Sequence, residues 1–259
     1  KNKIVSFTSI GTIIATISSA VGLGNIWKFP TMVGMNGGAG FILIYLLSSI
    51  FIALPIMIAE FYLGQKTKSD AVSSIEKIAP NNKWRYVGYL GLFASLLLTT
   101  FYTCVIGWLV AYFVKSLAGN VVTADITLAS ENFNNIISSP LTTLGFQWFV
   151  YIAVSLVLIL GIKKGTERLV KIFLPLLVFL LLILTVNSLT LDKAGEGLRF
   201  LFDIRSFKFS SNIIILAMGL AFFKLSIGSA IMQTYASYFP EKVSLPNVAL
   251  KVALADLLI

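Results

Sequence analysis

Two charged side chains lie inside long apolar segments of this 259-residue sequence. Lys224 lies in AMGLAFFKLSIGSA (217–230), and Glu60 lies in LPIMIAEFYLGQ (54–65). A charged group in an apolar environment needs a partner or a water-filled cavity, so both residues are candidates for a functional site. For Lys224 the sequence leaves three interpretations open: a lysine paired with a carboxylate, a neutral lysine, or a decayed copy without function.

Few other residues could carry out covalent chemistry. The sequence contains no histidine and a single cysteine, Cys104, so His-centred metal sites and an internal disulfide are excluded. No paired carboxylates and no serine beside a base are visible. The sequence therefore predicts that the protein is not an enzyme.

The composition is that of an integral membrane protein. Hydrophobic residues make up 57% of the chain and charged residues 12%, and the mean hydropathy is +0.90. Soluble domains carry about 25% charged residues. The apolar runs are long enough to be spanning helices. We expect seven spans, at roughly 7–30, 39–64, 86–114, 145–162, 169–190, 211–239 and 245 onward.

The net charge of +9 is unevenly distributed between the loops. Two links together carry nine of the 20 basic residues, whereas the link between the third and fourth spans holds only Lys115. The basic residues are Lys66, Lys68, Lys77, Lys83 and Arg85 after the second span, and Lys163, Lys164, Arg168 and Lys171 after the fourth. The positive-inside rule then predicts a multi-pass protein of the inner (plasma) membrane with a cytoplasmic N-terminus, and not a nucleic-acid-binding protein.

Two spans are interrupted by small and polar residues. The first contains SSAVGLGN (18–25) and the sixth contains LSIGSA (225–230). Such residues allow close helix packing, but glycines also favour unwinding. Unwound backbone is tolerated at membrane depth where it lines a cavity or is buried in protein. Broken helices at corresponding positions of two halves point to the binding site of a transporter.

The connecting segments have distinct predicted forms. MNGGAG (35–40) is typical of a tight turn with glycines at positive φ. The polar segment 116–144 is expected to be a solvated external loop. KAGEGLRFLF (193–202) is expected to form a short amphipathic helix at the external surface.

Several motifs together resemble the neurotransmitter:sodium symporters, and especially their bacterial amino-acid transporters. The motifs are SSAVGLGNIWKFP, NGGAGFILIYLL, LPIMIAEFYLGQ, FYTCVIGW, GIKKGTERLVKIFLP and TYASY. The resemblance implies an all-α membrane fold with inverted repeats and broken first and sixth helices. The chain would hold a single, incomplete membrane domain (1–259), with the first five-span repeat at 1–190 and the start of the second at 211–259.

The chain is expected to lack part of this fold. It begins with Lys1, and it ends in VALADLLI, inside an apolar run. About seven of the family's roughly twelve spans would be present. The C-terminal half of the fold would then be missing from this sequence and would act as a partner of the part that is present.

The resemblance also implies a site for an amino-acid substrate. Family members that carry charged amines have an aspartate at the position of Gly22, so the glycine favours a substrate with its own carboxylate. Tyr102 would bind that carboxylate, and Phe223 would cover the substrate. The implied substrate-binding residues are Ala20, Gly22, Leu23, Gly24, Leu98, Tyr102, Phe223, Ser226 and Ser229. Glu60 would accept hydrogen bonds from an unwound helix, and Lys28 would stand at the outer gate.

The family's two sodium sites are not both expected here. The second site would use the carbonyls of Ser18 and Val21, completed by spans beyond this chain. The first-site positions are Ala20, Asn25, Lys224 and Asp256, with Lys224 in place of an oxygen ligand. An ammonium donates hydrogen bonds and cannot coordinate a cation, so we expect Lys224 to replace the first sodium ion. Asp256, Asn25 and the substrate carboxylate would be its partners.

The sequence thus predicts a secondary active transporter that couples amino-acid uptake to a cation by alternating access, with one sodium site. The alternative is a truncated, non-transporting membrane scaffold or binding protein derived from such a transporter. An ion channel is less favoured, because no charged pore motif is visible.

Overall fold

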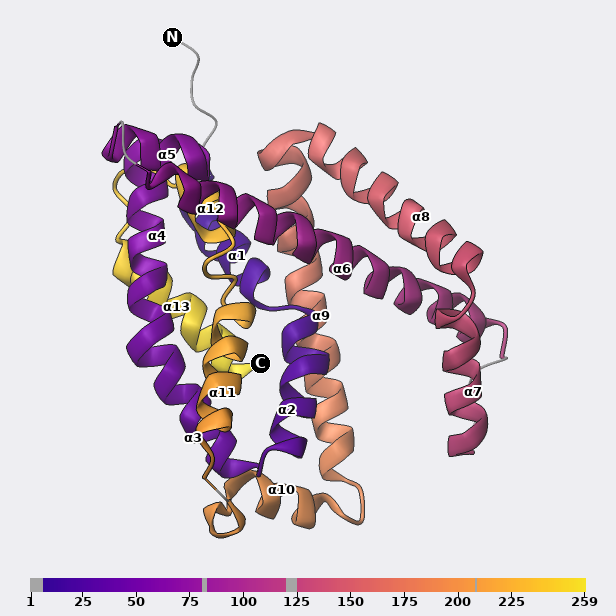
Figure 1. The fold of residues 1–259 in the computed structure, drawn as a ribbon. Helices are drawn as coiled ribbons and strands as arrows, with labels where there is room; N and C mark the ends of the chain where they lie inside the picture. The colour runs from indigo at the N-terminus through magenta and orange to yellow at the C-terminus, as the bar shows by residue number, and fades with distance from the viewer. Residues whose placement is uncertain (1–6, 81–82, 120–124, 208) are drawn as a thin grey trace. The chain divides into compact units, whose positions relative to one another are not determined.

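The computed structural model describes residues 7–80, 83–119, 125–207 and 209–259, and these form helices throughout (Figure 1). The chain separates into two compact units. The first contains the segments up to Leu92 and from Ile162 to Ile259, and the second contains Phe93–Gly161. The predicted division into repeats at 1–190 and 211–259 concerns internal symmetry and stays a prediction.

The first unit begins with two apolar helices, each interrupted by a π-helical turn. Its N-terminal elements are α1 (Ser9–Ala20), the π-helix η1 (Gly24–Lys28), α2 (Phe29–Met35), α3 (Ala39–Ser48), the π-helix η2 (Ser49–Ala53), α4 (Leu54–Thr67) and α5 (Ala71–Ile78). Gly37 and Gly38, at φ 88° and 56°, make the turn from α2 to α3, which confirms the predicted glycine turn.

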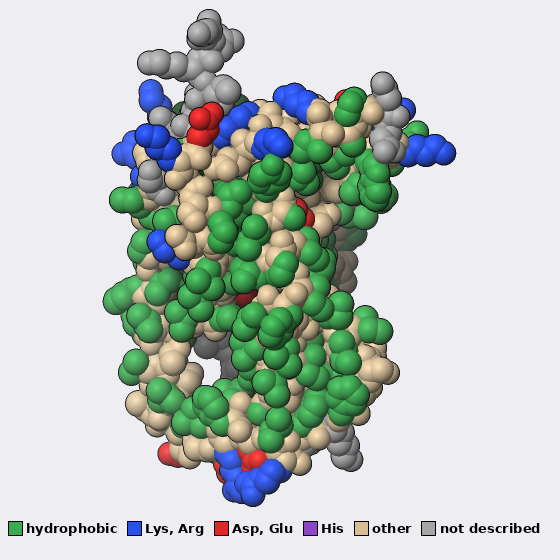
Figure 2. All heavy atoms as spheres, turned by 90° about the vertical axis from the view of Figure 1, so that its left-hand side faces the viewer, with side chains coloured by type: hydrophobic (Ala, Val, Ile, Leu, Met, Phe, Trp, Pro, Cys, Tyr) green, Lys and Arg blue, Asp and Glu red, His purple; other side chains and the backbone are tan. Residues whose placement is uncertain are grey.

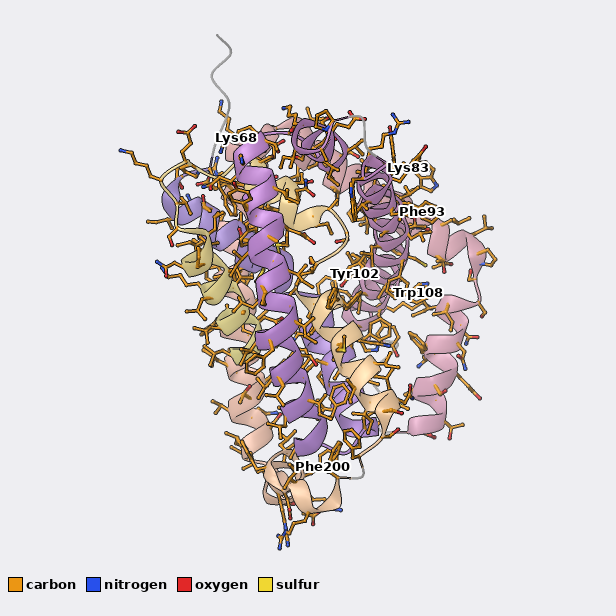
Figure 3. The ribbon with its side chains drawn as sticks, turned by 60° about the vertical axis from the view of Figure 1, so that its left-hand side comes forward. Lys68, Lys83, Phe93, Tyr102, Trp108 and Phe200 are labelled. Atoms are coloured by element: carbon orange, nitrogen blue, oxygen red, sulfur yellow. The ribbon has the colours of Figure 1, made fainter. Side chains whose placement is uncertain are left out.

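The first unit is completed by the C-terminal part of the chain. Its elements are the π-helix η3 (Ile162–Thr166), α9 (Glu167–Leu189), α10 (Ala194–Phe202), the short 3₁₀ helix η4 (Ile204–Ser206), α11 (Ser211–Lys224), α12 (Ile231–Ser237) and α13 (Leu245–Leu258). The predicted helix at 193–202 is confirmed as α10, which lies at the same end of the unit as the α2–α3 turn (Figure 1). Lys68 at the end of α4 and Phe200 on α10 mark opposite ends of the unit (Figure 3).

The buried core of the first unit lies where α3 and α4 pack against α11, α12 and α13. Phe41, Tyr45, Phe61 and Phe239 are among its largest fully buried side chains. Gly64 allows the closest approach of α4 to α12, because a Cβ at this position would overlap the Gln233 carbonyl oxygen. The broken sixth span is thereby held against α3 and α4.

The second unit contains most of α6 (Arg85–Leu117), with α7 (Ile126–Ile137) and α8 (Pro140–Ile159). Inside it, the Trp108 indole donates to the Thr143 hydroxyl at 3.3 Å, and Gln147 donates to the Thr103 hydroxyl at 3.2 Å. The prediction of a loop at 116–144 is wrong in part, because this segment contains α7. Asp125 caps this helix by accepting from the Thr127 amide at 2.8 Å, and residues 120–124 of the segment lie outside the described residues.

Four helices of the described chain are long and apolar enough to cross a membrane. They are Ala39–Thr67, Arg85–Leu117, Pro140–Ile159 and Lys164–Leu189. Ile10–Ala20 and Gly24–Met35, bent by 41°, make a fifth span if they are counted together. The remaining two of the seven predicted spans are represented by shorter helices: α11 and α12, separated by 225–230, and the 14-residue α13.

The surface agrees with membrane insertion. On the face shown in Figure 2, hydrophobic side chains cover the middle, and Lys and Arg side chains gather at the two ends. The all-helical membrane fold and the breaks in the first and sixth predicted spans are therefore confirmed.

Candidate functional site

The first helix breaks at Val21, directly after α1. Val21 has the extended angles φ −90° and ψ 111°, which turn its carbonyl out of the helical ladder. The π-helical turn η1 then starts with a 3.1 Å hydrogen bond from the Asn25 amide to the Gly22 carbonyl. Gly24 brings this turn against the end of α11, because a Cβ there would lie 3.3 Å from Lys224 Cγ and 3.4 Å from Phe223 Cε1.

The sixth span breaks directly after Lys224. Ser226, Gly228 and Ala230 all have positive φ, at 53°, 77° and 61°, so the chain cannot continue as a right-handed helix. The Ser226 hydroxyl donates to the Ser19 carbonyl at 2.9 Å and so ties the two breaks together. Two segments more than 200 positions apart in the sequence thereby share one polar region within the apolar unit.

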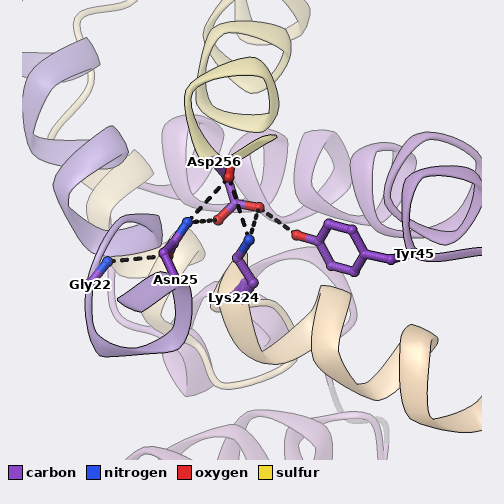
Figure 4. A network of polar contacts seen from close by, with 5 residues as sticks. All are labelled: Gly22, Asn25, Tyr45, Lys224 and Asp256. Carbon is purple, nitrogen blue, oxygen red and sulfur yellow. Dashed lines mark hydrogen bonds and ion pairs between the residues drawn. The ribbon is translucent and has the colours of Figure 1, made fainter. Parts of the chain in front are cut away.

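Lys224 and Asp256 form a buried ion pair at this point. The Lys224 ammonium lies 3.3 Å from Asp256 Oδ2 and donates to the Asp256 carbonyl at 3.4 Å (Figure 4). The two residues are only 3% and 1% exposed. Removing two charges from solvent is costly, and the attraction offsets that cost only when further hydrogen bonds satisfy both groups. The other partners of Asp256 therefore matter.

Asn25 and Tyr45 supply those hydrogen bonds. The Asn25 amide donates to Asp256 Oδ1 at 3.0 Å and to the Asp256 carbonyl at 3.2 Å, and its Oδ1 accepts from the Gly22 amide at 3.3 Å. The Tyr45 hydroxyl donates to Asp256 Oδ2 at 2.5 Å. Asn25 therefore contacts the aspartate, where the sequence predicted a contact with the lysine. Sequence reasoning missed Tyr45 entirely.

Two aromatic rings complete the surroundings of the ammonium. The Lys224 nitrogen lies 4.2 Å from the centroid of the Phe29 ring and 4.8 Å from that of Tyr45. The negative face of an aromatic ring attracts a cation, most strongly where water is excluded. Oxygen atoms and ring faces together thus surround the charge.

Glu60 contacts the second break. Its Oε1 accepts a 2.7 Å hydrogen bond from the Gly228 amide, while its Oε2 is buried without a partner in the described structure. Since Gly228 lies in unwound backbone, its amide has no helical acceptor and needs a side chain instead. This is the geometry of an acceptor for an unwound helix, the role predicted for Glu60.

The first sodium site of the family does not fit these residues. Sodium is a hard cation that binds oxygen ligands, whereas this position holds an ammonium, and the Asn25 oxygen is already bonded to the Gly22 amide. The second site fits better, since Ser18 and Val21 offer backbone carbonyls at the end of α1. No group of three His, Cys, Asp or Glu that could hold a metal ion occurs among the described residues.

The other predicted residues are distributed over both units. Ala20, Leu23 and Phe223 lie at the two breaks, and the Ser229 hydroxyl donates to the Ser226 carbonyl at 3.1 Å. Lys28 is exposed on η1. Leu98 and Tyr102 lie on α6 in the second unit, and Tyr102 is labelled in Figure 3. The Tyr102 ring packs edge-on against that of Phe101. Their part in a pocket stays a prediction.

A second buried carboxylate lies at the opposite end of α1. Glu167 Oε1 accepts from the Thr8 hydroxyl at 2.6 Å and from the Lys171 ammonium at 2.7 Å. Glu167 is 3% exposed, and a Cβ at Gly11 would overlap its carboxylate. Nearby, the Phe7 amide donates to the Tyr238 carbonyl at 3.0 Å. The amino end of α1 is therefore fastened to both α9 and α12.

The fold of this chain is similar to that of a solved protein. The solved structure of MhsT in complex with L-phenylalanine is 39% identical to this chain and superposes with a TM-score of 0.89, over 97% of this chain and 58% of that one. A Bacillus subtilis protein described as the uncharacterized sodium-dependent transporter YhdH is 34% identical over 252 residues, which are 97% of this chain and 56% of the relative.

A more distant relative comes from mouse. Its sodium-dependent neutral amino acid transporter B(0)AT3 is 27% identical over 275 residues, which cover 94% of this chain and 44% of the relative. The chain thus spans about half the length of the curated relatives it matches. The model of the sodium:neurotransmitter symporter family matches residues 7–140 and 137–258. The chain therefore belongs to the sodium:neurotransmitter symporter family, a family of transporters and not of enzymes.

Proposed function

We propose that this protein carries an amino acid across the plasma membrane by sodium-dependent alternating access, and that the Lys224 ammonium takes the place of the first sodium ion. The observation that carries the proposal is the 3.3 Å contact between Lys224 and Asp256, buried where the two broken helices meet. Although Asp256 neutralises its charge, the ammonium has a third N–H donor that could bind a substrate carboxylate where a cation would otherwise coordinate it.

The form of the first break supports an amino acid as the substrate. Nothing lies within 4 Å of a Cβ built on Gly22, so this position leaves room beside the unwound backbone. Amide groups at helix N-termini favour an anion. The relatives agree with this class, since one is described as a neutral amino acid transporter and another is seen with L-phenylalanine. Ala20, Leu23 and Gly24 would line the main-chain side of the site.

Coupling would then depend on one sodium ion. The carbonyls of Ser18 and Val21 would hold this ion together with ligands from outside the chain. Sodium here would stabilise the broken end of α1 and so favour the substrate-binding conformation. Lys224 would stay with the protein throughout the cycle and would not be released with the substrate.

The test is uptake by the purified protein in liposomes. With labelled phenylalanine, leucine or tryptophan, initial rates should rise with sodium concentration with a Hill coefficient of about one. Lys224→Thr restores an oxygen ligand and should raise the coefficient toward about two. The matched control is Lys251→Thr, which removes an exposed lysine from α13 and should leave the coefficient unchanged.

Two results would contradict the proposal. A coefficient of about two in the unchanged protein would show that a second sodium ion binds despite Lys224. Amino-acid binding without any uptake would favour the alternative of a non-transporting binding protein.

A further inference from the structure

The surroundings of the Lys224 nitrogen suit an ammonium group better than a metal ion. The ammonium contacts two oxygens of Asp256, at 3.3 and 3.4 Å, and the faces of two aromatic rings. A primary ammonium has three N–H donors for the oxygens and a positive charge that the ring faces attract. Sodium would find too few oxygens here to replace its hydration shell.

The rings are held in position independently of the lysine. Phe29 and Tyr45 contact each other edge to face, with centroids 5.0 Å apart. Tyr45 is 1% exposed and is anchored by its hydroxyl to the same carboxylate oxygen that pairs with Lys224. Asp256 is also held by Asn25. The socket formed by Phe29, Tyr45 and Asp256 should therefore persist when the lysine side chain is shortened.

One wall of the socket, the ring of Phe29, borders a cavity, whereas Tyr45 and Asp256 do not line it. A cavity of about 730 Å³ is lined by Asn25 and Phe29, together with residues of α9 and α10. Its walls are mostly apolar, so a small alkyl chain could enter it. An amine that carried such a chain would arrive at the ring of Phe29.

We propose that Phe29, Tyr45 and Asp256 form a binding site for primary alkylammonium ions, which Lys224 fills from within the chain. The proposal goes beyond the transport function and does not require it. It predicts that a protein without the lysine side chain takes up an ammonium ion from solution at this site. Sodium should not bind at this site in place of the ammonium ion, because the two rings offer it no oxygen ligands.

The direct experiment uses Lys224→Ala and propylammonium. This ion reproduces the four deleted heavy atoms, Cγ, Cδ, Cε and Nζ. In the purified variant, a saturating concentration should raise the apparent thermal midpoint by about 2–4 °C. The unchanged protein should show no such shift, because its own lysine fills the site.

The controls separate charge, donors and chain length. 1-Propanol has the alkyl chain without the charge, tetramethylammonium has the charge without N–H donors, and sodium chloride matches the ionic strength. None should reproduce the shift. Phe29→Leu combined with Lys224→Ala should weaken propylammonium binding by about 3- to 30-fold, the range expected for losing one desolvated cation–π contact. An equal shift with sodium, or an equal affinity in the Phe29→Leu background, would overturn the proposal.

A second measurement covers the case in which Lys224→Ala does not accumulate. Lys224→Met keeps the length of the side chain but removes its charge. The proposed socket requires that Phe29→Leu lower the thermal midpoint more in the protein with Lys224 than in the Lys224→Met protein. Equal losses in the two backgrounds would show that Phe29 is only a packing residue. Both readouts measure stability, so a failure of amino-acid uptake would leave them interpretable.

Discussion

The Thr8 hydroxyl donates a 2.6 Å hydrogen bond to Glu167 Oε1 and so joins the amino end of α1 to the first turn of α9. The same oxygen of Thr8 accepts from the Gly11 amide at 2.9 Å and caps α1. One hydroxyl therefore satisfies a free helix amide and a buried carboxylate at once. Any movement of the amino half of α1 away from α9 must break this bond.

Thr8→Val should destabilise the protein by about 1–3 kcal/mol, because it removes the cap and leaves the buried Glu167 with one donor fewer. Thr8→Ser keeps the hydroxyl and should cost clearly less. Denaturant unfolding or the apparent thermal midpoint of the purified variants would measure the difference. Equal losses for valine and serine would mean that the bond contributes nothing to stability.

Asp256→Asn should leave the Lys224 ammonium without its counter-charge while preserving the shape of the side chain. Breaking a buried pair in this way costs about 3–5 kcal/mol. Lys224→Met alone should also destabilise, since it leaves an unpaired carboxylate. The double variant should recover a large part of the combined loss when thermal midpoints are compared. Strictly additive losses would contradict a direct interaction between the two charges.

Gly64→Ala should separate α4 from α12. The new Cβ would overlap the Gln233 carbonyl oxygen and lie 2.9 Å from the Ala236 Cβ, and backbone cannot move aside as a flexible side chain can. The expected cost is about 1–3 kcal/mol. Gly219→Ala on α11 is the matched control. Nothing lies within 4 Å of its added Cβ, so this change should stabilise by about 0.5–1 kcal/mol.

Asp70 should make the stability of α5 depend on pH. The side chain and amide of Ser73, and the Val72 amide, hold the pKa of this carboxyl below its ordinary value of 3.8. A carboxyl with a lowered pKa in the folded state contributes its full stabilisation above the unfolded pKa of about 3.9, and loses it as the pH falls through the folded value. Thermal midpoints between pH 6 and about pH 3 should fall more for the unchanged protein than for Asp70→Asn. A parallel decline in both proteins would exclude this contribution.

The predicted orientation can be tested by labelling single cysteines in a Cys104→Ser background. Glu76 on α5 and Glu196 on α10 are exposed, and these helices lie at opposite ends of the first unit (Figure 1). With the N-terminus in the cytoplasm, a membrane-impermeant maleimide added to intact cells should label Glu196→Cys and spare Glu76→Cys. The reverse pattern would show that the basic loops face outward.

The sequence predicted the parts of the site that depend on local chemistry. Glycine and serine in the first and sixth spans indicated the breaks, because these residues weaken a helix wherever they occur. The resemblance to the family put Lys224 and Asp256 at corresponding positions of one site, and the structure places them 3.3 Å apart. The roles of these residues in binding and coupling stay predictions.

The contacts that sequence reasoning missed depend on packing between distant elements. Tyr45 is an ordinary aromatic residue in an apolar run, and only the approach of α3 to α13 turns its hydroxyl toward Asp256. Thr8 and Glu167 are separated by 159 positions, and no local pattern connects them. The helix α7 and its cap Asp125 were not predicted, because the polar composition of the segment indicated a loop.

The three left-handed residues between Lys224 and α12 also limit how this segment can vary. Ser226 and Ala230 hold angles that cost a residue with a side chain about 1–2 kcal/mol and that a β-branched residue tolerates least. In a saturation library across 225–230, glycine and asparagine should be enriched at these two positions, and valine, isoleucine and threonine should be depleted at all three. The backbone angles thus restrict which residues this segment accepts, in addition to the hydrogen bond that the Ser226 hydroxyl makes to Ser19.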